Sequence, residues 1–356
     1  MKRIHIYYEG IRYTVADREV DDLKAEIKSA LAGESPYWLK VNHGEGTLRE
    51  TELLIAPGIG LAITPIDPAA EEPLSAEGVA LPGIADGTKK VAFGLTEPDA
   101  GSNSHEVSTT ATRDGDGWRI SGSKYYISAI DQCDAILLVA RDAEHSTPEK
   151  KKLSIFVIPT DAEGLSWQKI PTSIVSPDKQ FSVFLDNVHI GPETLVGEAG
   201  QGMRQVFAAL NPERILVGAI TGGVGRFAIE KAADYAKTRE VWKVPIGQHQ
   251  GVAHPLAAAH IDVEVARLAT KNAAVLYDEG DPGVAEAANI AKFVGAEAAL
   301  KALDQAIQVH GGNGLSHEYG LSELWFVTRL MRTAPVSREM VLNFVAQTSL
   351  GLPRSY

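Results

Sequence analysis

Apolar and polar residues alternate over two short runs at the start of the chain. Residues 4–8 and 11–15 place apolar side chains at every second position, with a Glu-Gly pair between the runs. This pattern predicts a β-hairpin. Residues 20–31 then change to helical spacing. With two further extended pieces around 37–41 and 51–64, the pattern predicts a small α+β unit.

The composition and the spacing of apolar residues change twice in the next part of the chain. Residues 67–90, which follow the α+β unit of residues 1–66, have no sustained period and are rich in Pro, Ala, Glu and Gly. We interpret them as a linker. Short β-rich runs then fill residues 91–197, separated by turn residues such as the Asp-Gly-Asp-Gly at 114–117. Five or more such runs favour a small antiparallel barrel or sandwich.

Helical spacing dominates the last part of the chain, residues 198–356. A stripe of small residues over 287–302 recurs every three or four positions and allows close helix packing. Similar patterns cover 201–237, 252–278 and 320–350. Long helices joined by short links predict an antiparallel helical bundle.

Composition narrows the class of protein. A chain of 356 residues, 44% of them apolar, is long enough for two or three domains with a sizeable core. No apolar run reaches the length of a membrane span, and the start does not read as a signal peptide, so we expect a cytoplasmic protein. The net charge of −12 disfavours a nucleic-acid-binding role. The single cysteine, Cys133, excludes an internal disulfide and a cysteine metal cluster, and no histidine spacing indicates a metal site.

Four short motifs carry candidate chemistry. Residues 95–103 combine a proline and a glycine in a loop that exposes backbone N–H groups and hydroxyls, which can hold a carbonyl-rich ring or a phosphate. Residues 122–128 alternate aromatic and hydroxyl side chains, which can stack on a planar cofactor. The third motif is 239–242 with 245–250, and the fourth is 308–314, where two glycines close a helix. Taken singly, a turn, a core strand or a helix cap explains each of them.

In this order and at these separations, the four motifs resemble the acyl-CoA dehydrogenase family, over residues 78–356. The resemblance implies an α+β multidomain fold with the family's middle β-barrel and C-terminal antiparallel helical bundle, here preceded by an atypical α+β unit. It also implies an oxidoreductase of fatty acid metabolism that binds FAD between barrel and helices and oxidises an acyl-CoA. Its electron acceptor would be an electron-transfer flavoprotein, with no nucleic-acid partner.

The resemblance assigns site residues by motif. Ser102, Asn211 and Arg214 match positions near the acyl-CoA. Two of the FAD-binding groups, residues 239–250 and residues 308–312, match segments that reach a neighbouring subunit's FAD, which implies a homotetramer or at least a homodimer. The positions matched to FAD contacts are Phe93, Leu95, Thr96, Gly101, Ser102, Tyr126, Ile127, Ser128, Arg239, Trp242, Gln250, Gln308, Gly311, Gly312, Ser337 and Glu339.

The chemistry that the resemblance implies needs a base. Removing a proton next to a thioester requires a carboxylate with a raised pKa in a dry site, while flavin accepts a hydride from the next carbon. Most family members carry this base in a Tyr-Glu-Gly-Thr segment, where this chain has Pro335 in place of the Glu. A minority branch carries it in a Glu-Arg pair on an early helix of the C-terminal domain, which Glu213 and Arg214 match. Glu213 is therefore the candidate base. The alternative is that Glu213 only complements a helix dipole in the first turn.

Two departures from the family keep a second function open. Pro335 has no N–H, although a backbone N–H of that segment donates to the thioester oxygen in the family. Either Val336 takes that role, the alignment slips locally, or the enzyme is slow. Residues 1–65 do not resemble the helical domain with which family members begin; a fusion, a truncation joined to foreign sequence or an engineered chain would explain this. Both departures favour, as the alternative, a non-catalytic or partner-dependent flavin-binding subunit. A third hypothesis is an acyl-CoA oxidase, which uses oxygen as its electron acceptor.

Overall fold

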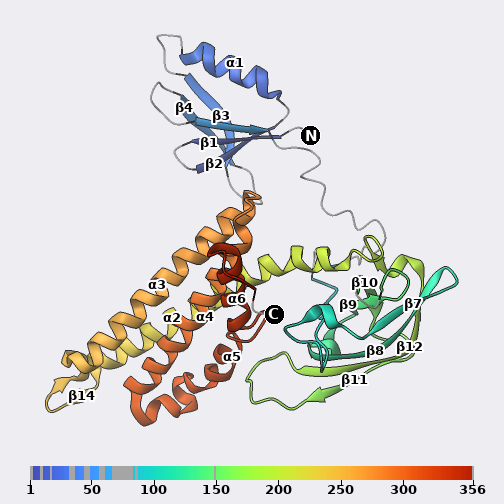
Figure 1. Ribbon diagram of the computed structural model, residues 1–356. Helices are drawn as coiled ribbons and strands as arrows, with labels where there is room; N and C mark the ends of the chain where they lie inside the picture. The colour runs from blue at the N-terminus through green and yellow to red at the C-terminus, as the bar shows by residue number, and fades with distance from the viewer. Residues whose placement is uncertain are drawn as a thin grey trace. The chain divides into compact units, whose positions relative to one another are not determined.

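The chain folds into two compact units, residues 1–76 and 77–356, in a computed structural model (Figure 1). The predicted linker, residues 67–90, lies largely outside the described residues, so its boundaries stay a prediction. The structure describes residues 3–8, 11–16, 18–31, 37–43, 49–55, 61–65, 83–84, 87–147 and 150–354.

The first unit is a five-stranded antiparallel sheet with one helix. The predicted hairpin and helix are confirmed, while the extended piece expected over 51–64 is two strands. The strand order is β4-β3-β2-β1-β5. Helix α1 contributes Leu23 and Ile27 to a core that also contains Ile4, Ile6 and Leu39. The elements are β1 (Arg3–Tyr8), β2 (Ile11–Ala16), α1 (Val20–Leu31), β3 (Tyr37–His43), β4 (Arg49–Ile55) and β5 (Leu61–Pro65).

The second unit begins with an eight-stranded sheet. Its strands pair in the order β11-β12-β8-β7-β9-β10-β13, and β6 also pairs with β9. The Asp-Gly-Asp-Gly turn joins β7 to β8 as predicted, with Asp114 opposite Gly117. Trp118 and Phe156 stack edge to face in its buried core. The strands are β6 (Val91–Gly94), β7 (Thr110–Asp114), β8 (Gly117–Ser128), β9 (Ala135–Asp142), β10 (Leu153–Pro159), β11 (Leu165–Ile170), β12 (Gln180–Ile190) and β13 (Leu195–Val196).

The pairing of this sheet differs from the antiparallel pattern that the sequence predicts. Both β6 and β7 run parallel to β9, so the sheet is mixed. The hairpin strand β8 lies between β7 and β9 in the sequence, which brings β9 back in the direction of β7. The β-rich middle region itself is confirmed, and its ladder ends at β11 and β13 without closing among the described strands.

Three long helices follow the sheet. They are α2 (Gly202–Thr238), α3 (Gln250–Asp278) and α4 (Val284–His310), and they pack side by side (Figure 1). A short hairpin, β14 (Glu240–Val241) and β15 (Val244–Pro245), joins α2 to α3. None of the helices that the structure describes is both long and apolar enough to cross a membrane.

The helical pattern over 320–350 does not form one long helix. It breaks into α5 (Trp325–Leu330) and α6 (Arg338–Phe344), together with shorter turns. Pro335 explains the break, because proline cannot donate to a helix and it also disfavours helical geometry in the residue before it. The segment between α5 and α6 is therefore not helical, and it contacts α4 at Lys292.

Glycine allows α2 and α3 to approach closely. A Cβ added at Gly218 would lie 2.7 Å from Oγ1 of Thr270 on α3. Thr270 is buried and donates to the Ala266 carbonyl, so it has little freedom to move away. We expect Gly218→Ala to lower the free energy of unfolding by about 1–3 kcal/mol, because it overpacks this contact. Urea unfolding measures the change.

A glycine one turn further along α2 provides the matched control. A Cβ at Gly222 would meet no atom of the described residues within 4 Å, apart from the backbone of its own helix. Gly222→Ala should therefore leave stability unchanged or raise it by about 0.5–1 kcal/mol, through the better helix propensity of alanine. Equal losses for the two variants would contradict the close packing at Gly218.

A second hydrophobic core joins the sheet to the start of α2. Val206 lies in it with Val139 and Ile155 of the sheet, and Leu210 packs against it. The same core contains Ala100 and is packed by Leu95, from the loop after β6. This core, which we call the junction core, therefore sets that loop beside the first turns of α2.

Candidate active site

A buried ion pair fixes the loop after β6 to strand β8. Lys124 is fully buried, and its Nζ donates to Oε1 of Glu97 at 2.8 Å and to the Leu95 carbonyl at 3.1 Å. Glu97 also accepts from both the backbone N–H and the hydroxyl of Ser108, and from the Thr109 N–H at 2.9 Å. The Glu97 carboxylate thus accepts four hydrogen bonds, which leaves the loop little freedom.

The electrostatics of this pair favour the ionised carboxylate. Burial alone would raise the pKa of Glu97, but the charge of Lys124 and the surrounding hydrogen bonds lower it to about 2. Burial lowers the pKa of Lys124 to about 8, against the opposing effect of Glu97. The pair therefore remains charged at neutral pH.

Strand β8 presents Tyr126 in an unusual backbone conformation. Its φ is 56°, in the left-handed region that bulky residues rarely adopt, and its side chain is 54% exposed. The pairing register between β8 and β12 shifts at this point. The neighbouring Tyr125 N–H donates to the Thr96 carbonyl at 2.8 Å, which joins this strand to the loop. Strain of this kind is concentrated at functional sites.

The other predicted flavin contacts of the sheet lie on the same two segments. Phe93 is exposed on β6, Ile127 is buried beneath the surface, and the Ser128 hydroxyl bonds with the side chain of Gln180. We call this group the sheet-edge group. Its members are Phe93, Leu95, Thr96, Gly101, Ser102, Tyr126, Ile127 and Ser128.

The predicted base and its neighbours lie on α2, just after Leu210 of the junction core. Arg214 is buried and donates to Oδ1 of Asn211 at 3.0 Å, while its Nε has no partner among the described residues. Glu213 is exposed as a whole residue, yet partial burial of its carboxyl raises its pKa, against the charge of Arg214. Because α2 begins at Gly202, Glu213 lies well inside the helix, and the first-turn interpretation is wrong.

A buried lysine links the segment after α5 to this group. Lys292 on α4 donates from Nζ to the Val336 carbonyl at 2.6 Å. Burial, together with the positive charge of Arg214, lowers the pKa of Lys292 to about 8, and the charge of Glu339 opposes that shift. Ser337 caps α6 by accepting from the Met340 N–H. Lys292 thus connects the segment that carries Ser337 and Glu339 to α4, and it lies near Arg214 of α2.

The remaining predicted FAD contacts lie at the opposite end of the helices. Trp242, at the tip of the β14–β15 hairpin, is 82% exposed and has a left-handed φ of 51°. The end of α4 lies nearby, because His310 stacks on Tyr235 at 4.3 Å and Asn313 donates to the Tyr235 hydroxyl. We call these residues the bundle-end group: Arg239, Trp242, Gln250, Gln308, Gly311 and Gly312.

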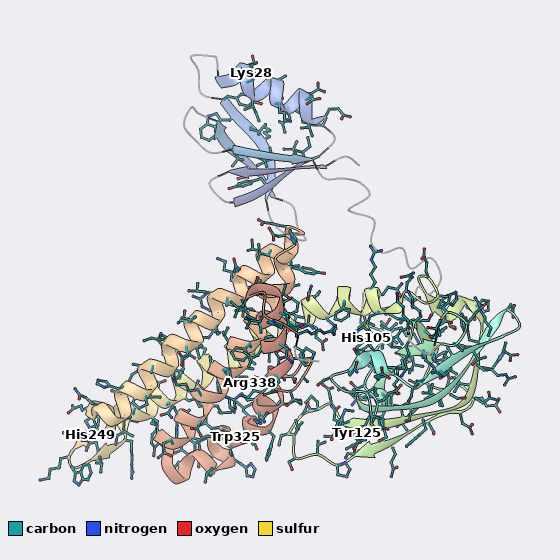
Figure 2. All side chains as sticks on the ribbon, in the orientation of Figure 1. Lys28, His105, Tyr125, His249, Trp325 and Arg338 are labelled. Carbon is teal, nitrogen blue, oxygen red and sulfur yellow. The ribbon has the colours of Figure 1, made fainter. Side chains whose placement is uncertain are left out.

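Within one chain, the bundle-end group and the sheet-edge group lie on opposite sides of the second unit. Figure 1 shows β14 at the far end of the long helices from the sheet, and Figure 2 shows His249 and Tyr125 on opposite sides of this unit. If both groups contact FAD, each must act on a different copy of the cofactor. This arrangement is what the expected contribution to a neighbouring subunit requires.

Sequence reasoning missed the buried charges that hold these segments. Glu97 and Lys124 both lie inside the motifs at 95–103 and 122–128, and Lys292 lies within the sequence range of the small-residue stripe of α4 but not in the stripe itself. Lys292 instead follows helical spacing with Ala288, Gly295 and Ala299, and a lysine in such a row of small residues was the available signal. For Lys124 the signal was a charged residue in a strand otherwise rich in aromatic and apolar residues.

Comparisons with known proteins agree with this architecture. Residues 92–188 match the middle domain of acyl-CoA dehydrogenases, and residues 200–350 match their C-terminal domain. Acyl-CoA dehydrogenase FadE12 of Mycobacterium tuberculosis (strain H37Rv) is 58% identical over 277 residues, covering 78% of this chain and 71% of that protein. Glutaryl-CoA dehydrogenase of Desulfococcus multivorans is 34% identical over 246 residues, covering 68% and 61%.

Solved structures of the same kind share the fold. Butyryl-CoA dehydrogenase from Megasphaera elsdenii superposes with a TM-score of 0.69 at 27% identity, covering 73% of this chain and 68% of that one. The glutaryl-coenzyme A dehydrogenase complex with glutaryl-CoA gives 0.70 at 30% identity, covering 74% and 67%. Two matching domain models, a close relative and two solved structures agree, and this chain belongs to the acyl-CoA dehydrogenase family.

Proposed function

We propose that this FAD-dependent dehydrogenase oxidises an acyl-CoA thioester to the 2,3-enoyl-CoA, with Glu213 as the base. The observation that carries the proposal is the junction core. It packs Leu95 and Ala100 of the predicted flavin loop together with Leu210, three residues before Glu213. The candidate base and the sheet-edge group therefore belong to one continuous piece of structure.

The residues of the sheet-edge group fit an isoalloxazine ring. Tyr126 and Phe93 present exposed aromatic surface, and Ile127, next to Tyr126, lies in the core of the sheet. Gly101, in the anchored loop, would meet no atom within 4 Å if it carried a Cβ, so its backbone is open to a ligand. These residues would hold the ring, and FAD, when bound, accepts a hydride from the substrate.

In the proposed reaction, Glu213 takes the proton from C2 of the acyl chain. The C2–H electron pair forms the C2=C3 double bond while a hydride leaves C3. Partial burial raises the pKa of the Glu213 carboxyl, which makes it a stronger base than an ordinary glutamate. The Nε of buried Arg214, which has no partner among the described residues, can donate to an acceptor of the CoA moiety.

The thioester oxygen needs a donor in place of Pro335. We assign this role to the Val336 N–H, the next backbone donor in the segment. Lys292 holds the carbonyl of the same residue. A preorganised donor of this kind stabilises charge that develops on the oxygen during proton removal.

The proposal includes a second copy of the chain. The bundle-end group lies away from the sheet edge, with Trp242 almost fully exposed, and Gly311 has a left-handed φ of 58° that leaves its backbone open. We assign this group to the FAD of a neighbouring subunit in a homodimer or homotetramer. The electrons would then pass to an electron-transfer flavoprotein.

Two observations favour a second candidate, a non-catalytic or partner-dependent flavin-binding subunit. Pro335 lacks the N–H that the family uses, and the first unit is a β-sheet with one helix rather than a helical domain. This candidate also binds FAD, so cofactor content does not separate it from the enzyme.

Anaerobic reduction of the bound flavin separates the two candidates. We expect the purified chain to be yellow, and at least one member of a panel of short, long, branched and aromatic acyl-CoAs to bleach its visible absorbance. Dithionite provides the full-reduction control. If dithionite bleaches the flavin and no acyl-CoA does, the non-catalytic candidate is correct. Oxygen consumption by the acyl-CoA-reduced protein would reassign it as an oxidase.

A further inference from the structure

We infer that Lys292 is a positioning residue, which holds the Val336 segment in place opposite Arg214 for the dehydrogenation. The inference rests on the proposed function, because it assigns a task to the segment that replaces the family's usual base segment. Lys292 itself need not touch the substrate. Its action is through Val336.

The contact with Val336 is one of several that tie this segment to α4. Lys292 donates to the Val336 carbonyl at 2.6 Å. Glu297, further along α4, accepts from Arg338 at 3.1 Å and pairs with Arg332. The two arginines flank the break around Pro335. The path between α5 and α6 is thus held on both sides and in the middle by one helix.

The burial of the Lys292 ammonium group is unfavourable for the free energy of folding. The residue is 1% exposed, and no carboxylate among the described residues lies within ion-pair distance of its Nζ. Burying an ammonium group without a directly paired charge is unfavourable. The nearby positive charge of Arg214 adds to the cost, while the more distant charges of Glu297 and Glu339 offset part of it. A methionine of similar length would fill the space without that cost. The lysine gains one strong hydrogen bond in exchange, and that bond fixes the peptide between Val336 and Ser337.

The position of this peptide matters because of what lies around it. Val336 follows Pro335, which stands where most family members have their base, and it precedes Ser337, which matches a flavin contact. Arg214, next to the candidate base, is close enough to affect the charge of Lys292. A displacement of about 1 Å in such a site lowers a rate by roughly 100-fold.

The test replaces Lys292 with Met in the full FAD-loaded chain. We expect kcat per bound FAD to fall roughly 100-fold while KM changes by less than about threefold, because the segment acts on the reacting thioester rather than on binding. Lys301→Met is the matched control: Lys301 lies on the same helix, is exposed and pairs with Asp262 at 2.6 Å. The control should keep wild-type kcat. Glu297→Gln, which weakens the hold on Arg332 and Arg338, should lower kcat in the same direction and serves if the first variant does not fold.

Hydrogen exchange makes the result independent of turnover. Backbone amides of residues 336–339 should exchange faster in Lys292→Met than in the wild type and the Lys301→Met control. If the wild-type chain binds FAD but no acyl-CoA reduces it, the proposed function fails, and this exchange result alone decides whether Lys292 holds the segment. Unchanged exchange, or a wild-type kcat per bound FAD in Lys292→Met, would overturn the inference. Loss of FAD or of thermal stability with unchanged kcat per bound FAD would make Lys292 a structural core residue only.

Discussion

Replacing Glu213 with Gln is expected to slow reduction of the bound FAD by acyl-CoA by roughly 10²–10⁴-fold, the contribution typical of a general base. Glutamine keeps the shape of the side chain but cannot accept the C2 proton at neutral pH. Glu213 lies in the middle of α2 and is exposed as a whole residue, and glutamine has nearly the same volume, so the substitution should not disturb packing. Anaerobic stopped-flow measurement of flavin absorbance gives the rate directly.

Two comparisons make the Glu213 result specific. Glu230→Gln, an exposed position on the same helix, should reduce at the wild-type rate. In the wild type, the rate should rise with pH as Glu213 loses its proton. Because partial burial raises the pKa of Glu213, that rise should occur above the ordinary range of a glutamate. A Glu213→Gln variant with the wild-type rate would remove Glu213 from the chemistry.

Replacing Lys124 with Met is expected to have the largest effect on folding and on FAD content. The change leaves the ionised carboxylate of Glu97 buried without its charge partner, which typically costs about 3–5 kcal/mol. It also removes the bond to the Leu95 carbonyl, so the loop and strand β8 lose their link at the sheet-edge group. We expect a lower midpoint of thermal unfolding and less FAD per chain. Calorimetry and the ratio of flavin to protein absorbance measure the two effects.

A double variant distinguishes charge burial from general damage to the core. Adding Glu97→Gln to Lys124→Met removes the unpaired charge, and the double variant should therefore be more stable than Lys124→Met alone. Its FAD content should stay low, because the bond to Leu95 is still missing. If the two single losses of stability simply add, Glu97 and Lys124 do not act as a pair.

Local patterns predict the elements of this fold better than their pairing. The Asp-Gly-Asp-Gly turn at 114–117 and the long periods of α2, α3 and α4 are local, so the sequence alone indicates them. The parallel pairing of β7 with β9 depends on contacts between distant residues, which no local pattern contains. The region 320–350 keeps a helical spacing of apolar residues, yet Pro335 divides it, and spacing alone does not weigh one proline against a long pattern.

The candidate site divides in a similar way. Motif order reveals the residues of the sheet-edge group, and the structure brings them together. Lys124 and Glu97 are 27 residues apart, and only the fold shows that they are buried against each other. The burial of Lys292 is equally hard to predict from the sequence, because a lysine in a helix is usually exposed. The charges that position a site are thus harder to predict from sequence than the residues that line it.

The most direct test of Glu213 as the base is deuterium uptake at C2 of an acyl-CoA that reduces the flavin, with the FAD-loaded chain kept anaerobic in D₂O. Mass spectrometry of the recovered acyl-CoA measures the uptake. We predict deuterium at C2 with the wild type and none above background with Glu213→Gln. Equal uptake by the two proteins would contradict the assignment.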